Sequence, residues 1–318
     1  MIVLANDGIT SGGKETLEKA GFEVHTVRVA QEQLANYLLE NKVTALLVRS
    51  ATQVDKHIID SCPDLQLIGR GGVGMDNIDV AYAKERGRHV INTPAASSDS
   101  VAELVFAHLS GGVRSLHESN RLMPLEGDIH FKALKNSFAK GSELRGKTLG
   151  IIGFGRIGKA VARLALGAGM KVIYNDQTTP RGSVEVSFFD GRSVPFEFTT
   201  TPFEELLRTS DFITLHVPAQ KKPVIGAEEI KKMKAGAALV NTSRGGIVDE
   251  VALIDALEEG KLRFAALDVF TSEPKPEVQI LMQPKLSLSP HIGASTVEAQ
   301  ERIGEELAQG VIRCLQTA

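Results

Sequence analysis

Residues 149–165 read LGIIGFGRIGKAVARLA and place a glycine-rich turn between an apolar strand and a helix with apolar periodicity. The turn carries Gly153, Gly155 and Gly158 in the spacing G-x-G-x-x-G. A second apolar strand, residues 171–175, follows the helix and ends at Asp176. This order of elements is typical of the first βαβ unit of a Rossmann-type domain, which binds a dinucleotide.

Each glycine of this turn has its own physical task. Gly153 allows the tight turn, Gly155 lets the backbone approach a pyrophosphate, and Gly158 lets helix and strand pack closely. The helix N-terminus offers free N–H groups and partial positive charge to the phosphates. Asp176 can accept hydrogen bonds from ribose hydroxyls and would repel a 2′-phosphate, so the sequence predicts NAD rather than NADP. A bare strand–helix turn is the alternative interpretation.

The same glycine spacing also begins at Gly69, in a different context. Residues 75–79 after it read MDNID, which indicates a turn rather than a helix, and no strand ending in an acid follows at the expected distance. The backbone N–H groups of Gly72, Val73 and Gly74 instead predict an anion nest suited to a carboxylate. A plain turn remains the alternative.

Short apolar strands alternate with helices along most of the chain. The first series of expected strands is 2–6, 45–48, 65–68 and 89–92, with helices at 33–40, 54–62 and 80–86. The second series of expected strands is 148–152, 171–175, 212–217, 237–241, 264–269 and 286–288. The alternation predicts fold class α/β, with two doubly wound parallel-sheet domains.

The segment between the two series, residues 95–146, has helical patterns but no strand. We expect a helix at 100–110 and a loop at 122–141. Another departure is a β-hairpin, with arms at 184–189 and 193–198, because Asp190 and Gly191 between them are typical of a tight turn with positive φ angles.

Bulk properties exclude several classes of protein. The 318 residues suggest two domains of about 150 residues. A net charge of −3 argues against nucleic acid as a partner. The sequence has no apolar run long enough for a membrane span, and its start lacks a basic segment followed by an apolar core, so we expect neither a membrane span nor a signal peptide. Cys62 and Cys314 lack metal-type spacing and fit a reducing cytosol, so we expect a cytoplasmic protein without a metal.

Three chemically suited residues follow three successive predicted strands: Arg244, Glu273 and His291. In open α/β sheets, ligands bind at the carboxyl ends of the strands. Histidine can exchange a proton near neutrality, a neighbouring carboxylate can orient its ring, and arginine can grip a carboxylate with two bonds. Singly, each residue type is more often structural or solvated. Among the other histidines, His216 before Pro218 is the one in a comparable place.

Four motifs together resemble the D-2-hydroxyacid dehydrogenase family: residues 153–158, 241–250, 267–274 and 290–293. The resemblance covers nearly the whole chain in order and implies that Arg244, Glu273 and His291 are catalytic. The cofactor contacts that it implies, together with those argued above, are Gly153, Gly155, Arg156, Ile157, Gly158, Asp176, Thr242, Ser243, Asp268 and Gly293.

The same resemblance implies the division into domains. A smaller, flavodoxin-like substrate domain is expected from residues 1–95 and 294–318, its last helix at about 294–317, and a Rossmann-type NAD domain from residues 96–293. A homodimer is expected through helix 100–110 and the loop 122–141, because that loop carries apolar residues without a regular element. These apolar residues are Leu122, Met123, Leu125, Phe131, Leu134 and Phe138.

Residues 48–52 (VRSAT) and 69–79 (GRGGVGMDNID) resemble the substrate loops of family members that oxidise 3-phosphoglycerate with NAD in serine biosynthesis. The implied substrate-binding residues are Arg49, Ser50, Arg70, Gly72, Val73 and Gly74. There are three departures: Ser97 replaces a frequent Asn, the hairpin is longer than usual, and the chain ends at 318 without the C-terminal regulatory domains of longer members.

Charge counting supports the phosphorylated substrate. Its phosphate carries about −1.5 to −2 charges besides the carboxylate, and Arg244 can answer only one of these groups. Arg49 and Arg70 follow neighbouring expected strands and could answer the phosphate; the alternative is that both are solvated or paired with acids. Two other functions stay open: a reductase for glyoxylate, hydroxypyruvate or another small acid, and a dinucleotide-sensing protein without turnover.

Overall fold

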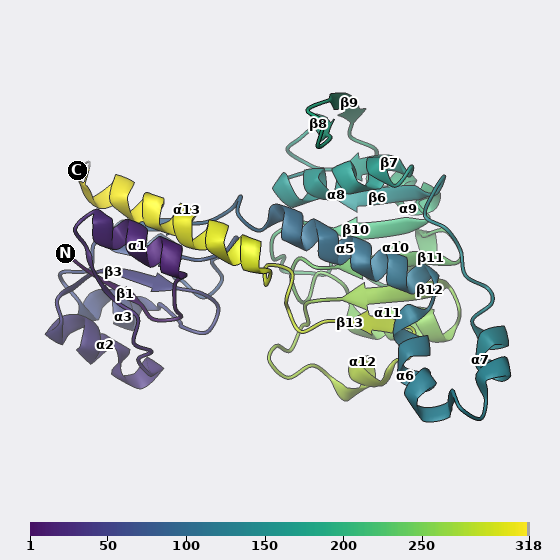
Figure 1. Cartoon of the computed structure of the whole chain (residues 1–318), viewed down its shortest axis with the longest axis horizontal. Helices are drawn as coiled ribbons and strands as arrows, with labels where there is room; N and C mark the ends of the chain where they lie inside the picture. Colours follow the sequence, from purple (N-terminus) through teal and green to yellow (C-terminus); the bar gives the residue numbers. More distant parts are fainter. Residues whose placement is uncertain (317–318) are drawn as a thin grey trace. The chain divides into compact units, whose positions relative to one another are not determined.

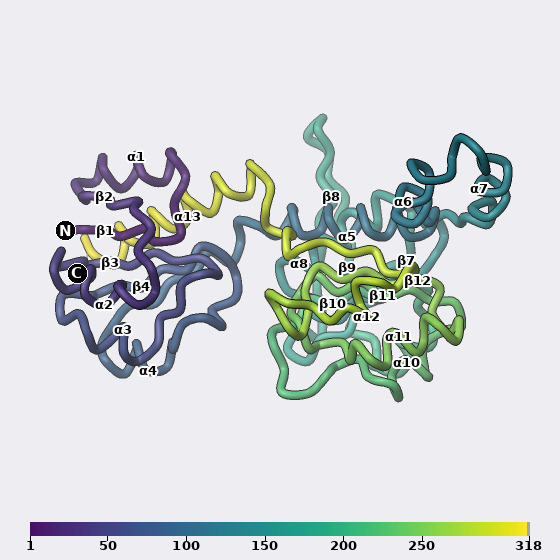
Figure 2. Tube along the Cα trace, turned by 90° about the horizontal axis from the view of Figure 1, so that it is seen from below, coloured from purple at the N-terminus to yellow at the C-terminus, as the bar shows by residue number. Residues whose placement is uncertain are grey.

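The computed structural model describes residues 1–316 and separates into two compact units (Figures 1 and 2). Unit 1 comprises Met1–Ser98 and the segment that starts at Ala294, and unit 2 comprises Asp99–Gly293. The expected ends of the last helix and of the substrate domain, at residues 317 and 318, lie outside the described residues.

Unit 1 is a parallel five-stranded sheet in the order β2-β1-β3-β4-β5, which is the flavodoxin-like doubly wound order. Its strands are β1 Ile2–Ala5, β2 Glu23–His25, β3 Val43–Val48, β4 Leu67–Arg70 and β5 His89–Asn92. Its helices are α1 Ser11–Lys19, α2 Gln31–Glu40, α3 Lys56–Ser61, α4 Val80–Glu85 and α13 Val297–Gln316.

Helices cover both faces of this sheet. Helices α1 and α13 supply Leu17, Leu307 and Val311 to one core, and α2 and α3 supply residues such as Leu34 and Ile58 to the other. Every residue of β3 is buried, as expected for a central strand covered on both faces. The alternation of strands and helices is therefore confirmed for this unit.

The sequence did not predict α1 and β2, and packing explains why α1 was missed. Only Gly13 and Leu17 of α1 are buried, so the helix has no apolar stripe. Its contact with α13 depends on close backbone approach, since a Cβ on Gly13 would lie 2.7 Å from the carbonyl oxygen of Gly304. A glycine–glycine contact of this kind leaves no signal in apolar periodicity.

Unit 2 contains a parallel six-stranded sheet in the order β13-β12-β11-β10-β6-β7. Its strands are β6 Thr148–Ile152, β7 Lys171–Asn175, β10 Phe212–Leu215, β11 Ala237–Asn241, β12 Leu262–Leu267 and β13 Leu286–Leu288. After β7 the chain returns to the opposite side of β6, where β10 pairs with β6. The sheet order reverses between β6 and β10, and ligands of doubly wound folds bind at such a switch point.

The helices of unit 2 also lie on both faces. The helices that pack on the sheet are α5 Ser98–Val113, α8 Arg156–Gly167, α9 Phe203–Thr209, α10 Ala227–Lys232, α11 Glu250–Glu258 and α12 Val278–Met282. One core combines α5 and α8 with the sheet, and the other combines α9 to α12 with it. None of the helices in the described residues is long and apolar enough to cross a membrane.

The β-hairpin is confirmed, with β8 Arg181–Ser187 paired antiparallel to β9 Ser193–Thr199. Its turn differs from the expected one. Only Gly191 has a positive φ, of 84°, whereas Asp190 does not. The N–H of Gly191 donates to Phe188 O and the N–H of Phe188 donates to Arg192 O. This pattern is a three-residue loop ending in a left-handed glycine rather than a two-residue turn.

The prediction of a loop at residues 122–141 is wrong. Two helices, α6 Leu116–Glu126 and α7 Phe131–Ser137, occupy most of this segment (Figure 1). Pro124 lies inside α6 and Gly127 is its C-cap, and both residue types disfavour a helix interior. No residue of α6 is buried, so the helix has no core-facing periodicity to detect. Its apolar residues, including Leu125 at 75% exposure, face outward.

Candidate active site

The glycine-rich loop after β6 has the geometry that its sequence predicts. Gly153 has a φ of 93°, and a Cβ there would lie 2.5 Å from His216 O. A Cβ on Gly158 would lie 2.2 Å from Gly153 O, so helix and turn could not pack as they do. At Gly155 a Cβ would meet nothing within 4 Å. Since Gly155 is also the N-cap of α8, open space adjoins unpaired helix N–H groups.

Asp176 lies just after β7 and beside this loop. Its Oδ2 accepts a 2.7 Å hydrogen bond from Phe154 N, and its Oδ1 accepts from the N–H and hydroxyl of Thr178 and from Thr179 N. Burial opposes ionisation of this carboxyl, but the hydrogen bonds outweigh burial and hold the pKa of Asp176 below its usual value. A carboxylate is therefore fixed at the edge of the switch point.

Two buried polar atoms at the carboxyl edge of the sheet lack hydrogen-bond partners among the described residues: Thr242 Oγ1 and His216 Nδ1. Strand β10 lies between β6 and β11, so the chain segments that follow these three strands lie at the same edge of the sheet as Gly153. Burial lowers the pKa of His216 to about 3, so its ring is neutral at physiological pH. Unpaired buried groups are rare in folded proteins and often indicate a missing ligand.

Arg244 lies on a rigid turn after β11. Asn241 Oδ1 accepts from the N–H and hydroxyl of Ser243, and Asn241 Nδ2 donates to Arg244 O at 2.9 Å. The Arg244 guanidinium donates to Ser243 O at 2.6 Å. A Cβ on Gly245 would lie 1.9 Å from Phe270 O, so this turn packs directly against the segment after β12. The turn thus holds an arginine at the carboxyl edge of the sheet.

His291 and Glu273 form the pair that the sequence predicts. Glu273 Oε2 lies 2.9 Å from His291 Nδ1, and Glu273 Oε1 accepts a 2.9 Å hydrogen bond from Phe270 N. The His291 side chain is 46% exposed. Its Nε2 has no hydrogen-bond partner in the described part of the chain. An Nδ1–H donated to the carboxylate leaves Nε2 available for exchanging a proton with a ligand.

Asp268 is a buried carboxylate that accepts three hydrogen bonds from the segment around His291. It is 1% exposed. Its Oδ1 accepts from Ser289 Oγ at 2.6 Å and from Ile292 N at 2.9 Å, and its Oδ2 accepts from Gly293 N at 2.9 Å. These three bonds attach the segment 289–293 to β12. That segment contains His291, whose φ of 55° is in the left-handed region that non-glycine residues seldom adopt.

The expected substrate residues lie together in unit 1. Strands β3 and β4 are adjacent and parallel, with Val48 opposite Arg70, so Arg49 and Arg70 occupy the same edge of the sheet. Asp7 Oδ2 accepts from Arg49 N at 2.7 Å, and Asn77 Nδ2 donates to Arg49 O at 2.9 Å. These bonds fix the backbone at the end of β3, just before Ser50.

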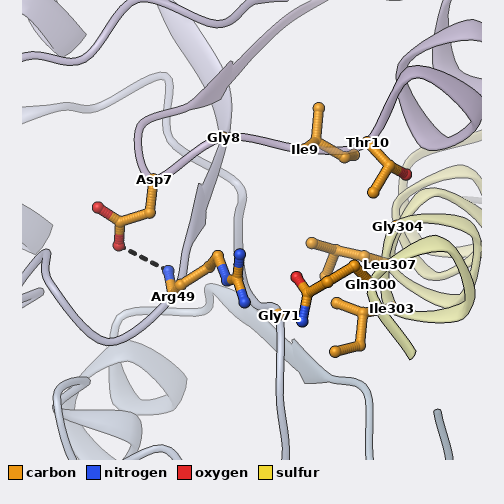
Figure 3. Close-up of a pocket in the computed structure, with 10 residues that line it drawn as sticks. All are labelled: Asp7, Gly8, Ile9, Thr10, Arg49, Gly71, Gln300, Ile303, Gly304 and Leu307. Carbon is orange, nitrogen blue, oxygen red and sulfur yellow. Dashed lines mark hydrogen bonds between the residues drawn. The ribbon is translucent and has the colours of Figure 1, made fainter. Parts of the chain in front are cut away.

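The Arg49 side chain extends into a pocket of about 200 Å³ (Figure 3). The pocket is lined by the segment after β1, by Gly71 and by residues of α13 such as Gln300. Within the described residues, the Arg49 guanidinium makes no hydrogen bond or ion pair. The acidic lining residue of this pocket, Asp7, accepts from Arg49 N and from Thr52 rather than from the Arg49 guanidinium.

The backbone nest next to this pocket has its carbonyls, rather than its N–H groups, bonded. Thr93 N donates to Gly72 O at 3.1 Å, and Asn92 Nδ2 donates to Val73 O at 2.7 Å. The N–H groups of Gly72, Val73 and Gly74 donate to no described residue of unit 1. Gly72 has a φ of 146°, and a Cβ there would overlap the Arg70 guanidinium.

Sequence reasoning missed His108, which lies on α5 and is 6% exposed. Its two ring nitrogens contact the hydroxyls of Ser287 and Ser289. A lone histidine in an apolar helix gives no signal of this network, because the partners follow it by more than 170 residues. No metal-binding group of His, Cys, Asp and Glu occurs in residues 1–316.

Comparisons with known proteins point to one family. Residues 106–293 match the model of the D-isomer specific 2-hydroxyacid dehydrogenase family, NAD binding domain. The chain is 40% identical over 317 residues to a hydroxypyruvate reductase of Thermotoga maritima, covering 98% of this chain and 97% of the relative. It is 39% identical to a D-3-phosphoglycerate dehydrogenase of Methanocaldococcus jannaschii, covering 99% of this chain and 57% of the relative.

Solved structures agree with this match. A Thermus thermophilus protein superposes with a TM-score of 0.85 at 31% identity, covering 100% of this chain and 97% of that one. A D-lactate dehydrogenase of Aquifex aeolicus, complexed with NAD and lactic acid, superposes with a TM-score of 0.76 at 29% identity, covering 100% and 96%. The glycine loop, the unpaired Thr242 hydroxyl and Asp176 fit the NAD-binding domain of this family, and NAD is the cofactor of this chain.

Proposed function

The chain belongs to the D-isomer specific 2-hydroxyacid dehydrogenase family, and from this premise we propose that it oxidises 3-phosphoglycerate with NAD to 3-phosphohydroxypyruvate. Activity toward D-2-hydroxy acids follows from the family. The choice of a phosphorylated acid depends on the residues of unit 1, and the assignment of roles depends on those of unit 2.

Unit 2 supplies the groups that the chemistry needs. Bound NAD would supply the acceptor for the hydride of C2 of the hydroxy acid. In the same step the C2 hydroxyl loses its proton to His291 Nε2, the ring nitrogen without a protein partner in the described part of the chain. Glu273 holds the ring through Nδ1 and stabilises the imidazolium that forms. Arg244, fixed by the turn at Asn241, is suited to grip the substrate carboxylate. Reduction of a 2-keto acid is the reverse of this sequence.

The observation that carries the substrate proposal is the Arg49 guanidinium, which faces its pocket without an ion pair among the described residues. A phosphate brings about −1.5 to −2 charges and three acceptor oxygens, which suit an arginine, whereas the neighbouring row of backbone N–H groups suits the substrate carboxylate. Arg70, at the same sheet edge, adds a second cation. A small unphosphorylated acid has no second anionic group to pair with the Arg49 guanidinium.

The second candidate is reduction of hydroxypyruvate or glyoxylate. It is favoured by the relative named hydroxypyruvate reductase, whose 40% identity extends over 97% of its length, and by a glyoxylate reductase of Thermococcus litoralis at 38% identity. The two candidates share the roles of Arg244, Glu273 and His291. They differ in what Arg49 and Arg70 bind.

A panel assay separates the candidates. NADH absorbance is followed with 3-phosphoglycerate and D-glycerate in the oxidative direction, and with 3-phosphohydroxypyruvate, hydroxypyruvate and glyoxylate in the reductive one. We expect kcat/KM to be highest for the phosphorylated pair. A higher kcat/KM for hydroxypyruvate or glyoxylate than for 3-phosphohydroxypyruvate would favour the second candidate.

His291→Asn is the matched control for the mechanism in either case. Asn cannot take up the proton, so turnover should fall by about 10²–10⁴-fold while the affinity for NADH stays unchanged. Near-normal turnover would remove His291 from the proposed role.

We also propose that the chain acts as a homodimer through α5 and the outward-facing arm of α6 and α7. Leu125, Ile129 and Phe131 on this arm are 75%, 77% and 58% exposed, an apolar surface that a second copy would cover. Light scattering at micromolar concentration tests the proposal, and a monomer would contradict it.

A further inference from the structure

A buried chain of hydrogen bonds connects α5 to the segment that carries His291. It begins at Ser287, passes through the His108 ring to Ser289, and ends on the Asp268 carboxylate, over distances of 2.9, 3.0 and 2.6 Å. Asp268 in turn accepts from Ile292 N and Gly293 N. All these residues belong to unit 2.

The donors and acceptors of this chain can be assigned. The Ser289 hydroxyl gives its single proton to Asp268, so towards His108 it can only accept. His108 Nε2 must therefore carry the proton. Burial lowers the pKa of His108, more than the nearby Asp268 carboxylate raises it, so the ring is neutral. A neutral ring with a proton on Nε2 has an acceptor at Nδ1, which accepts a hydrogen bond from the Ser287 hydroxyl.

We propose that His108 is a positioning residue for the reaction: it fixes the Ser289 hydroxyl and, through it, the Asp268 carboxylate that holds residues 289–293. The inference rests on the proposed role of His291, which lies between Ser289 and Ile292. The proposal gives α5 the task of holding residues 289–293 in place. The sequence motifs do not indicate this task, and Arg244, Glu273 and His291 do not perform it.

The geometry explains why the segment needs such support. His291 has a left-handed φ of 55°, a conformation that the surrounding bonds must stabilise. The side chain is 46% exposed, and its one hydrogen bond among the described residues is to Glu273, so packing does not fix it. Helix α5 contacts the same segment a second time, through a 2.7 Å bond from Ser100 Oγ to Gly293 O. Both contacts attach the segment to a helix of the unit's core.

The test is a double-mutant cycle with His108→Leu and Ser289→Ala. Each change removes one link between α5 and Asp268 and should lower kcat by about tenfold, since a small displacement of a reacting group is costly. If His108 acts through Ser289, the double variant should lose about tenfold as well, rather than the roughly 100-fold of two independent effects. The dissociation constant of NADH and the KM of the acid should change little.

Two further variants separate positioning from simple stability. Ser287→Ala leaves His108 Nδ1 unsatisfied but keeps the link to Asp268, so it should lower the melting temperature while kcat stays within about twofold. His108→Gln restores a donor near the Nε2 position and should recover most of the kcat lost in His108→Leu. A fall in kcat in Ser287→Ala as large as that in His108→Leu would overturn the proposal.

The ring itself gives a readout independent of folding. In NMR spectra of wild-type protein labelled with ¹⁵N-histidine, the His108 signals are identified by their absence from the spectrum of His108→Gln. These signals should show the Nε2–H tautomer at neutral pH. The Nδ1–H tautomer, or additive effects on kcat in the cycle, would contradict the proposal. Normal kcat in His108→Leu together with an inactive His291→Asn would overturn the role of His108 alone. An active His291→Asn would instead overturn the proposed mechanism.

Discussion

The spacing G-x-G-x-x-G occurs twice in this protein, and the two copies form different structures. In the copy at Gly153 the last glycine lies inside α8, whose first residue is Arg156, and the middle glycine faces open space. In the copy at Gly69 the first glycine belongs to β4, and a Cβ there would lie 2.7 Å from Leu47. The next helix, α4, begins only at Val80.

The difference shows that the spacing alone does not define a dinucleotide site. Around Gly153 the glycines bring backbone close to a helix N-terminus, whose partial charge suits a pyrophosphate. After Gly69 they leave a row of backbone N–H groups without a helix, which suits a single anionic group. The elements that follow each motif therefore carry more information than the motif.

The largest effect on cofactor affinity is expected from glycine substitutions in the Gly153 loop, because only this loop should bind NAD. In Gly158→Ala the new Cβ would meet Gly153 O at 2.2 Å, so the turn must shift, and the dissociation constant of NAD should rise about 100-fold, or ~2.7 kcal/mol. Gly155→Ala, whose Cβ meets no protein atom, should weaken NAD without lowering the melting temperature. Isothermal titration measures both affinities.

Gly71→Ala is the matched control in the other loop. Its Cβ would lie 3.2 Å from Ile303 in unit 1, so the affinity for NAD should stay unchanged. A loss of NAD affinity in Gly71→Ala similar to that in Gly158→Ala would erase the distinction between the two loops.

The next effect concerns the phosphate that is proposed to bind to Arg49, beside the Gly69 loop. Arg49→Ala removes the guanidinium that faces the pocket and should raise the KM for 3-phosphoglycerate by roughly 30-fold, the equivalent of ~2 kcal/mol for hydrogen bonds to a charged group. The KM for hydroxypyruvate should change little. Equal losses with both acids, or none with either, would take Arg49 out of a phosphate site.

A smaller effect is expected at Asp176, the residue beside the Gly153 loop that would bind the ribose of NAD. Asp176→Ala should weaken NAD about tenfold, because a charged acceptor for the ribose hydroxyls is lost. Binding of NADP should improve relative to NAD, since the carboxylate no longer repels a 2′-phosphate. Fluorescence titration with both cofactors checks this, and a wild-type protein that already prefers NADP would refute the assignment of Asp176.

The Gly153 loop could be predicted from local sequence because the residues that it needs are close together in the chain. The strand, the glycines, the helix and Asp176 are adjacent in the chain, and each leaves its own pattern. The His291–Glu273 contact could be expected from the rule that ligands bind at strand ends, together with the family motifs. Helix α6 could not be expected, because none of its residues is buried in its own unit.

The network around His108 shows the other limit of sequence reasoning. Its members, on α5 and on the segments at β12 and β13, become neighbours only through the strand order of the sheet. Similarly, the Arg49 pocket is closed by Gln300 and Ile303 of α13, a helix from the far end of the chain. Such contacts depend on topology, and no local spacing encodes them.

The smallest expected effect uses His216, a titratable residue that contacts the Gly153 loop and not the Gly69 loop. His216 O lies against Gly153, and the ring is buried, with its pKa lowered to about 3. An unfolded histidine has a pKa of about 6.5, so between these values the unfolded chain binds a proton that the folded chain does not. The free energy of unfolding must therefore fall as the pH drops from about 6.5 towards 3.

His216→Gln isolates this contribution, because glutamine does not titrate and can keep a contact with the Thr214 hydroxyl, which lies 3.0 Å from His216 Nε2. Between about pH 6.5 and 5.5 the wild type should lose about 1 kcal/mol more unfolding free energy than the variant. Urea unfolding followed by circular dichroism at both pH values measures the difference. Parallel losses in the two proteins would mean that His216 takes up its proton at the same pH in the folded and the unfolded chain, and burial beside Gly153 would then not keep its ring neutral.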